Sequence, residues 1–385
     1  MAGLGERIRG MSVAWFSFNL ATSAIVLASH ALGSAAGIDA LHSLARALAY
    51  INTAIYFIIA AAFLAKTVIA GREVLLALRH PVKGPFMTAI SISTMLLALD
   101  WGAVLGNPGV GAAFFYAGMV LHTLLFIVII YNFLMHEGIE IHSMNPGWYM
   151  PAVGNVLVPY VGGLLEAKGV AIPHSLLGVY LGTGVVFWLA LFTIWLYRSV
   201  FHNPPPARLL AATWINLAPP AVAPMSYEAL LGLMPHQYHE ALGRLTHEAP
   251  TVAGYLGAFF DMFYYTFWGL AGLLLPLILA VTVTYLRRGM MEFAESWWAF
   301  VFPIAAYSIS TIHLYLHHTG ESWLLYYAGF LYALTWLFYS VTTVLSVYYG
   351  YREWFGHTPR EKMPTLAKPL YEDVVSEEHG GEDKR

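Results

Sequence analysis

The sequence predicts an all-α integral membrane protein with ten transmembrane helices, and three observations support this prediction. The 385 residues are 58% hydrophobic and 11% charged, and the mean hydropathy is +0.62, whereas about a quarter of a soluble domain is charged. Apolar runs of about 20 residues, the length that crosses a bilayer, recur along most of the chain. The basic residues gather beside alternate ends of these runs.

The ten spans divide the chain into three parts. Residues 1–10 form a short N-terminal segment, residues 11–350 form the transmembrane pore domain, and residues 351–385 form a polar tail that we expect to be disordered. The first apolar run lacks the features of a cleaved signal, so we treat it as a retained helix. The spans are placed at residues 11–32, 48–68, 86–105, 113–135, 147–165, 177–197, 209–225, 262–286, 296–316 and 323–349.

The distribution of Lys and Arg tests the number of spans, because these residues concentrate in cytoplasmic loops. With the N-terminus inside, 16 of the 19 basic residues fall on the cytoplasmic side, and none falls within a span. Only Arg46, Lys168 and Arg244 fall outside. We therefore predict a multi-pass protein of the plasma (inner) membrane, with both termini in the cytoplasm.

The composition argues against several kinds of site. Cysteine is absent, which removes disulfides and thiolate ligands. The net charge is −3 and no basic cluster indicates a nucleic acid partner. The spans present no nucleophile with a nearby base and no complete ligand set, so we predict neither an enzyme nor a bound metal or cofactor.

Two groups of histidines leave alternatives open. His122 and His136 lie 14 residues apart on the fourth span, a separation that resembles the two-haem helices of cytochrome b, although no second pair has that spacing. A haem- or quinol-binding subunit of a respiratory oxidoreductase is therefore the alternative function. His236, His239 and Glu240 lie within one helical turn and could hold a metal, but we interpret them as solvated surface residues.

Ionised side chains are scarce in the spans, which favours a channel or facilitative transporter over an ion-driven pump. Away from span ends such as Glu166, the acids are Asp100 and Asp261. Asp100 lies towards the outer end of the third span. We interpret Asp100 as an interfacial residue, with a role in proton coupling as the alternative.

Helix breakers and polar stripes suggest which spans line a central path. Prolines interrupt the odd-numbered fifth, seventh and ninth spans at Pro151, Pro220 and Pro303, whereas spans 2, 4, 6 and 10 contain none inside. Proline frees a backbone carbonyl, which is tolerated where protein or water contacts the backbone. Phe16, Asn19 and Ser23 share one face of the first span, as Thr213, Asn216 and Pro220 do on the seventh. Ordinary packing between helices explains these patterns equally well.

Four stretches resemble the tellurite-resistance and dicarboxylate transporter family, which includes fungal malic-acid transporters, sulfite exporters and the slow anion channels of plant guard cells. They occur in family order and extend over nearly the whole membrane region. The stretches are RHPVKGPF at 79–86, NPGWYMPAVGNVLVP at 145–159, TWINLAPPAV at 213–222 and WWAFVFPIAAYSIST at 297–311.

The resemblance implies ten transmembrane helices arranged as five helical hairpins around a pseudo-fivefold central pore, with the odd helices inside. It also implies a homotrimer and a pore blocked by a phenylalanine of the ninth helix, which corresponds to Phe302. The expected partners are membrane lipid and small anions, such as chloride, nitrate, C4-dicarboxylates including malate, sulfite or tellurite. Asn155 and Asn216 match family pore helices.

His313 follows Phe302 by 11 residues, almost three helical turns, so both residues should share a face. We hypothesise that protonated His313 helps anions to enter at low pH; an interfacial location beside His317 and His318 is the alternative. With Phe302 as the gate, the predicted pore-lining residues are Phe16, Asn19, Ser23, Ser91, Pro151, Asn155, Thr213, Asn216, Pro220, Pro303 and His313.

Overall fold

The computed structural model describes residues 4–232, 250–291 and 293–355, and these ranges consist of helices joined by short loops and turns, without strands. The candidate metal ligands His236, His239 and Glu240, and the predicted disordered tail beyond residue 355, lie outside the described residues.

Every predicted span corresponds to a helix, and the helices of the even-numbered spans extend beyond their apolar runs. A short helix, α1 (Leu4–Gly10), precedes them. The others are α2 (Phe16–Ala36), α3 (Asp39–Arg79), α4 (Thr88–Leu99), α5 (Pro108–Met135), α6 (Met150–Glu166), α7 (His174–Phe201), α8 (Ala218–Gly232), α10 (Pro250–Arg287), α11 (Val301–Leu314) and α12 (Ser322–Phe355).

Among the described residues, eight helical segments are long and apolar enough to cross a membrane. The helices α6 and α8 contain only 17 and 15 residues, fewer than the roughly 20 that a crossing takes. Short 3₁₀ segments precede both, at Pro146–Tyr149 and Ala207–Leu217. The structure thus supports a multi-pass all-α membrane protein, while ten crossings stay a prediction.

Buried and exposed helices alternate along the chain. In the most apolar stretches of the segments that contain α2, α4 and α11, 78–83% of the residues are buried, against 17–33% in α3, α5, α7, α10 and α12. The helix α6 is almost entirely buried, as are residues 218–226 of α8. The odd-numbered spans are therefore the inner helices.

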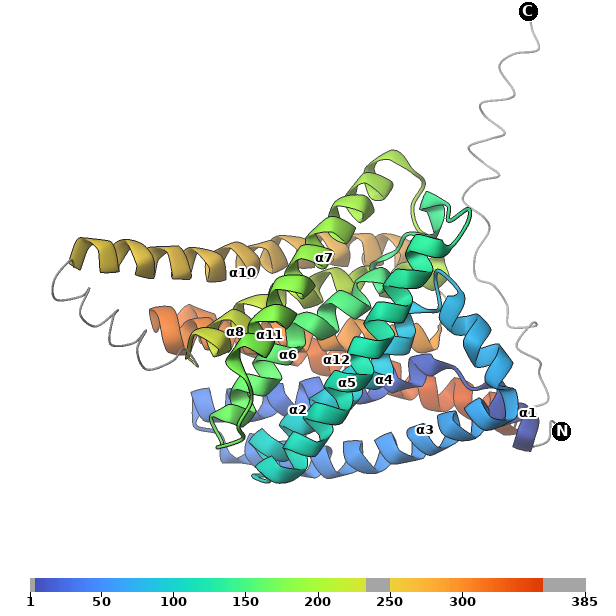
Figure 1. Cartoon of the computed structure of the whole chain (residues 1–385), viewed down its shortest axis with the longest axis horizontal. Coiled ribbons are helices and arrows are strands. Elements are labelled where there is room, and N and C mark those ends of the chain that lie inside the picture. The colour runs from blue at the N-terminus through green and yellow to red at the C-terminus, as the bar shows by residue number, and fades with distance from the viewer. Residues whose placement is uncertain (1–3, 233–249, 292, 356–385) are drawn as a thin grey trace, which may run out of the picture.

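The inner helices close a ring. Around this ring α2 packs on α4, α4 on α6, α6 on α8, α8 on α11, and α11 back on α2. Each inner helix also packs on the outer helix that follows it in sequence, which gives five hairpins (Figure 1). This arrangement confirms the predicted five-hairpin fold.

The two ends of the ring are distinguished by the chain's course. We call them the α1 end, where the inner helices begin, and the far end, where they finish (Figure 1).

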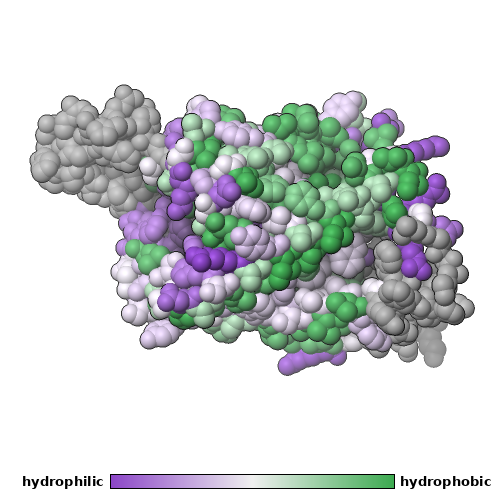
Figure 2. Space-filling model, turned by 90° about the horizontal axis from the view of Figure 1, so that it is seen from below, coloured by the Kyte–Doolittle hydropathy of each residue, from purple (hydrophilic) through white to green (hydrophobic). Residues whose placement is uncertain are grey.

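Large apolar side chains such as Ile58, Val68, Leu134 and Val200 are exposed on the outer helices. Figure 2 shows apolar side chains over the middle of one face and hydrophilic ones mainly towards its two ends. This surface suits a lipid environment between two aqueous layers.

Local sequence signals set several helix ends. The Asn107 side chain accepts a hydrogen bond from the Val110 amide at 3.1 Å and caps α5, whose first residue is Pro108. Gly37 ends α2 with φ of 67°, a left-handed conformation that favours glycine. The backbone of α3 departs from helical geometry at Ala70, which bends this 41-residue helix near the α1 end.

Candidate functional site: two cavities beside the inner ring

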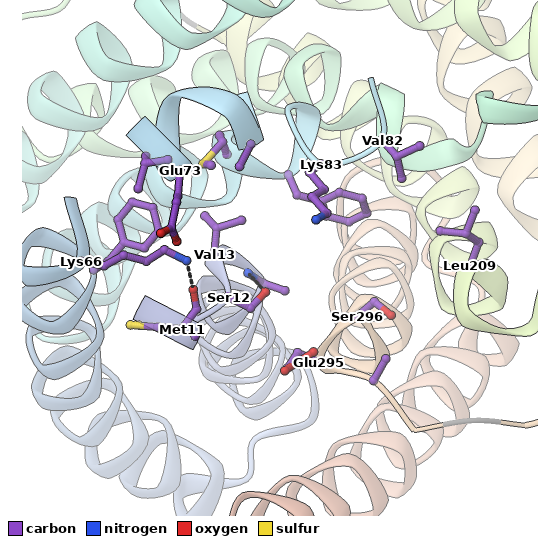
Figure 3. A pocket seen from close by; sticks show the side chains of 18 residues that line it. Met11, Ser12, Val13, Lys66, Glu73, Val82, Lys83, Leu209, Glu295 and Ser296 are labelled. Atoms are coloured by element: carbon purple, nitrogen blue, oxygen red, sulfur yellow. Dashed lines mark hydrogen bonds between the residues drawn. The ribbon is translucent and has the colours of Figure 1, made fainter. Parts of the chain in front are cut away.

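A large cavity opens at the α1 end of the ring. Its volume is about 470 Å³, and its walls come from the segment before α2, the bent part of α3, the loop before α4 and the segment before α11. Four charged side chains, Lys66, Glu73, Lys83 and Glu295, surround it (Figure 3). The Lys66 amine donates a hydrogen bond to the Met11 carbonyl at 2.6 Å.

A tight turn in the 79–86 motif brings Lys83 to this cavity. His80 Nδ1 accepts hydrogen bonds from the amides of Val82 and Lys83 at 3.0 and 3.3 Å. Partial burial, with the charges of Lys83 and His136, lowers the pKa of His80 below its usual value. Because Nδ1 accepts both hydrogen bonds, this nitrogen carries no proton. A Cβ at Gly84 would collide with the Leu78 carbonyl, so the turn requires glycine.

A small cavity of about 30 Å³ lies where the five inner helices begin. That is about the space of one liquid water molecule. Phe302 is one of its walls and is 8% exposed. The other lining residues are Ser17 and Leu20 of α2, Phe86 before α4, Met150 and Val153 of α6, Ile215 and Ala218 at the start of α8, and Trp298, Ala299 and Pro303 at the start of α11.

The two cavities adjoin. Phe86, from the 3₁₀ turn that precedes α4, lines both of them. The large cavity of about 470 Å³ and the small one of about 30 Å³ therefore share Phe86 as a wall. Of the predicted pore residues, Phe302 and Pro303 line the small cavity.

Several predicted pore residues of α2 instead contact a buried polar network. Asn19 Nδ2 donates to Asn52 Oδ1 of α3 at 2.9 Å. Ser23 Oγ and Asn52 Nδ2 both donate to Asp100 Oδ2 at 2.9 Å. Asp100 is completely buried within the protein. Its interpretation as an interfacial residue concerns its depth in the membrane and stays a prediction. Its two partners lie 77 and 48 residues away, beyond any local pattern. The Phe16 ring packs on Tyr56 and Phe63 of α3.

Ser91 and Pro151 meet at a buried histidine. His122 Nε2 donates to the Pro151 carbonyl, and Nδ1 lies 2.9 Å from Ser91 Oγ. A Cβ at Gly154 would collide with the His122 ring, so glycine allows this close approach of α5 and α6. Both ring nitrogens thus have protein partners, and neither is open to a haem iron.

The other predicted pore residues make local contacts. Asn155 Nδ2 donates to Thr183 Oγ1 of α7 at 3.3 Å. Thr213 Oγ1 donates to the Leu210 carbonyl and Asn216 Nδ2 to the Thr213 carbonyl, while Pro220 is buried in α8. A pore-lining role for these residues stays a prediction. His313 lies at the far end, where its Nδ1 is 3.0 Å from Glu228 Oε2.

The profile of the family described as voltage-dependent anion channel, SLAC1, matches residues 10–347. The chain belongs to this family. It is 27% identical to two uncharacterized transporters of Methanocaldococcus jannaschii, over 89% and 88% of this chain and 96% and 92% of theirs. It is 20% identical to a sulfite efflux pump of Trichophyton rubrum, over 78% of this chain and 80% of the pump.

Membership of the SLAC1 family confirms the family predicted from the four sequence stretches. It supports anion transport as the general function, in a family of channels and transporters rather than enzymes. The same finding favours anion transport over the haem- or quinol-binding alternative.

Sequence reasoning missed part of the cavity wall. Lys66 and Lys83 were recognised only as cytoplasmic charges. The prediction that no basic residue lies within a span is wrong, because Lys66 lies inside the span placed at residues 48–68 and inside α3. The Gly-Pro pair at 84 and 85 was the available signal, since it turns the chain back and carries Lys83 with it.

Proposed function

We propose that the chain conducts small anions along the axis of α2, α4, α6, α8 and α11, and that the Phe302 ring occludes this conduit. The observation that carries the proposal is the small size of the cavity at Phe302, which residues from all five inner segments surround. An aromatic ring at such a constriction obstructs any solute larger than water.

The electrostatics of this constriction favour anions. All five inner helices begin here, and each helix N-terminus contributes the equivalent of roughly half a positive charge. The inner helices themselves contain no Lys or Arg, so no fixed cation would trap a passing anion. The amines of Lys66 and Lys83 in the large cavity would attract anions to the approach.

The lack of arginine and lysine in the inner helices predicts broad selectivity among anions. Tight recognition of one oxyanion generally uses a bidentate arginine, which the inner helices lack. The candidate cargoes are chloride, nitrate, malate and similar C4-dicarboxylates, sulfite and tellurite. The sulfite efflux pump among the relatives supports including sulfite.

We further propose that the α1 end faces the cytoplasm of a prokaryotic-type plasma membrane and that the chain forms a homotrimer with one conduit in each subunit. The excess of basic residues at that end supports the orientation. Mass measurement of the complex in native nanodiscs tests the trimer.

Anion flux into proteoliposomes tests the conduit. We expect Phe302→Ala to raise the flux of chloride severalfold over wild type, because truncation opens the constriction, and to raise malate and sulfite flux in parallel arms. Phe300→Ala is the matched control. The Phe300 ring is also buried but packs on Trp214 and Phe338 rather than lining the small cavity.

The control separates gating from general loosening of the fold, since truncating either buried ring costs roughly 3–5 kcal/mol of stability. An increase in anion flux for Phe302→Ala, without one for Phe300→Ala, supports the proposal that the Phe302 ring occludes the conduit. Equal fluxes in the two folded variants, for every anion tried, would remove Phe302 from that role.

A further inference from the structure

A cluster of metal-ligating side chains lies at the far end, outside both cavities. Glu228 belongs to the last turns of α8, His313 to the end of α11 and His317 to the following turn, Tyr315–Thr319. His313 Nδ1 is 3.0 Å from Glu228 Oε2, and His317 Nδ1 contacts Glu228 Oε1. One ligand atom from each of the three residues lies within 4.8 Å of the others.

The scaffold holds these ligands from two sides. The helices α8 and α11 are neighbours in the inner ring, so the carboxylate and the imidazoles come from packed elements rather than from a loose loop. His313 and His317 are four residues apart, which places both rings on one side of the helix. The Tyr160 ring, 5.9 Å from that of His313, borders the cluster.

The cluster is accessible to an ion from solvent. The side chains of His313, Glu228 and His317 are 19%, 22% and 50% exposed. His317 is therefore the ligand on the solvent side of the cluster. Two imidazole nitrogens with one carboxylate form a donor set that zinc uses when it keeps a fourth position for water.

We propose that Glu228, His313 and His317 bind a divalent transition-metal ion of the zinc type. The two histidines bind through Nδ1, the carboxylate supplies the third ligand, and solvent fills the fourth position on the exposed side of His317. With neutral imidazoles, the bound ion changes the net charge of the cluster from −1 to +1. Metal binding is independent of whether the chain conducts anions, so failure of either proposal leaves the other standing.

The adjacent His318 provides a matched control. Its Nδ1 lies 2.9 Å from Asp261 Oδ1, so this histidine pairs with a different carboxylate and is not one of the three ligands. It belongs to the same helical turn as His317, although its side chain is 16% exposed against 50% for His317.

The test is isothermal titration of the full-length protein in detergent with zinc chloride, after treatment with a chelator and its removal. We expect one zinc per chain in the wild type and a loss of affinity well above tenfold in Glu228→Gln, His313→Ala and His317→Ala, since even partners outside the coordination sphere account for roughly 10–100-fold. His318→Ala should bind as wild type. Zinc should also raise the unfolding temperature of wild type and His318→Ala only.

Glu228→Gln preserves size and hydrogen bonding, so it guards against a misfolded variant. Undiminished binding in the three ligand variants would place the zinc elsewhere and overturn the proposal. Equal weakening by His318→Ala, or no wild-type binding at micromolar zinc, would overturn it as well.

Discussion

Asp100 and Glu228 are two carboxylates at the far end of the inner ring with opposite surroundings. Asp100 follows α4, is completely buried and accepts hydrogen bonds from Ser23 and Asn52, which are neutral donors. Glu228 belongs to the last turns of α8, keeps about a fifth of its side chain exposed and contacts two histidines.

The difference indicates different roles for the two acids. The donors of Asp100 come from α2 and α3, so this carboxylate joins three helices and offers solvent no access. The partners of Glu228 can exchange protons or bind a metal, and solvent reaches them. We therefore interpret Asp100 as a structural joint and Glu228 as the proposed metal ligand.

The largest expected effect is the loss of stability in Asp100→Ala. This change leaves the buried donors of Ser23 and Asn52 without their acceptor, at about 1–3 kcal/mol for each. We expect the free energy of unfolding to fall by about 3 kcal/mol or more. Asp100→Asn should lose much less, because its amide oxygen accepts the same bonds. Denaturant unfolding in detergent, followed by tryptophan fluorescence, measures both.

The asparagine variant also tests the alternative role of Asp100 in proton coupling. If Asp100 is a structural joint, the flux of Asp100→Asn follows the wild-type pH profile. A flattened profile in a stable Asp100→Asn protein would instead assign the carboxylate to proton transfer, and equal instability of Asn and Ala would show that the charge itself is required.

The fold was largely predictable from the sequence, because long apolar runs and the bias of basic residues are local properties. The sequence did not predict how each helix is rotated about its axis, and therefore which neighbour each of its faces contacts. Asn19 and Ser23 share a face, as their spacing predicted, but that face contacts Asn52 and Asp100. A stripe shows which residues lie together and does not show which neighbour they meet.

The far-end cluster escaped prediction for a similar reason. Glu228 lies 85 residues before His313 in sequence, and only the ring closure of α8 on α11 joins them. The four-residue spacing of His313 and His317 was the readable part of the signal. Phe302, by contrast, was found through a sequence stretch shared with the family, and its place beside the small cavity is compatible with the predicted gate.

Lys83 lies in the wall of the large cavity and is exposed to solvent, so its charge can act on anions that approach the conduit. For an anion passing about 8 Å away in water, one unit charge is worth ~0.5 kcal/mol, so Lys83→Glu should lower chloride flux about fivefold. High salt should reduce this difference by screening. Arg72→Glu, on an exposed part of α3 that does not line the cavity, is the matched charge reversal. Equal losses in both variants would point to a general surface potential.

The smallest expected effect is the change in chloride flux when Glu228 loses its charge. In the presence of a chelator, Glu228→Gln removes one accessible negative charge from the far end and should raise chloride flux about twofold at low salt, by the same Coulomb argument. Asp100→Asn should leave flux unchanged, because Asp100 is sealed among α2, α3 and α4. Proteoliposomes containing either variant, assayed at two salt concentrations, distinguish the roles. If chloride flux changes in Asp100→Asn but not in Glu228→Gln, the two roles assigned here are wrong. The buried acid would then act on the passing anion, and the accessible acid would not.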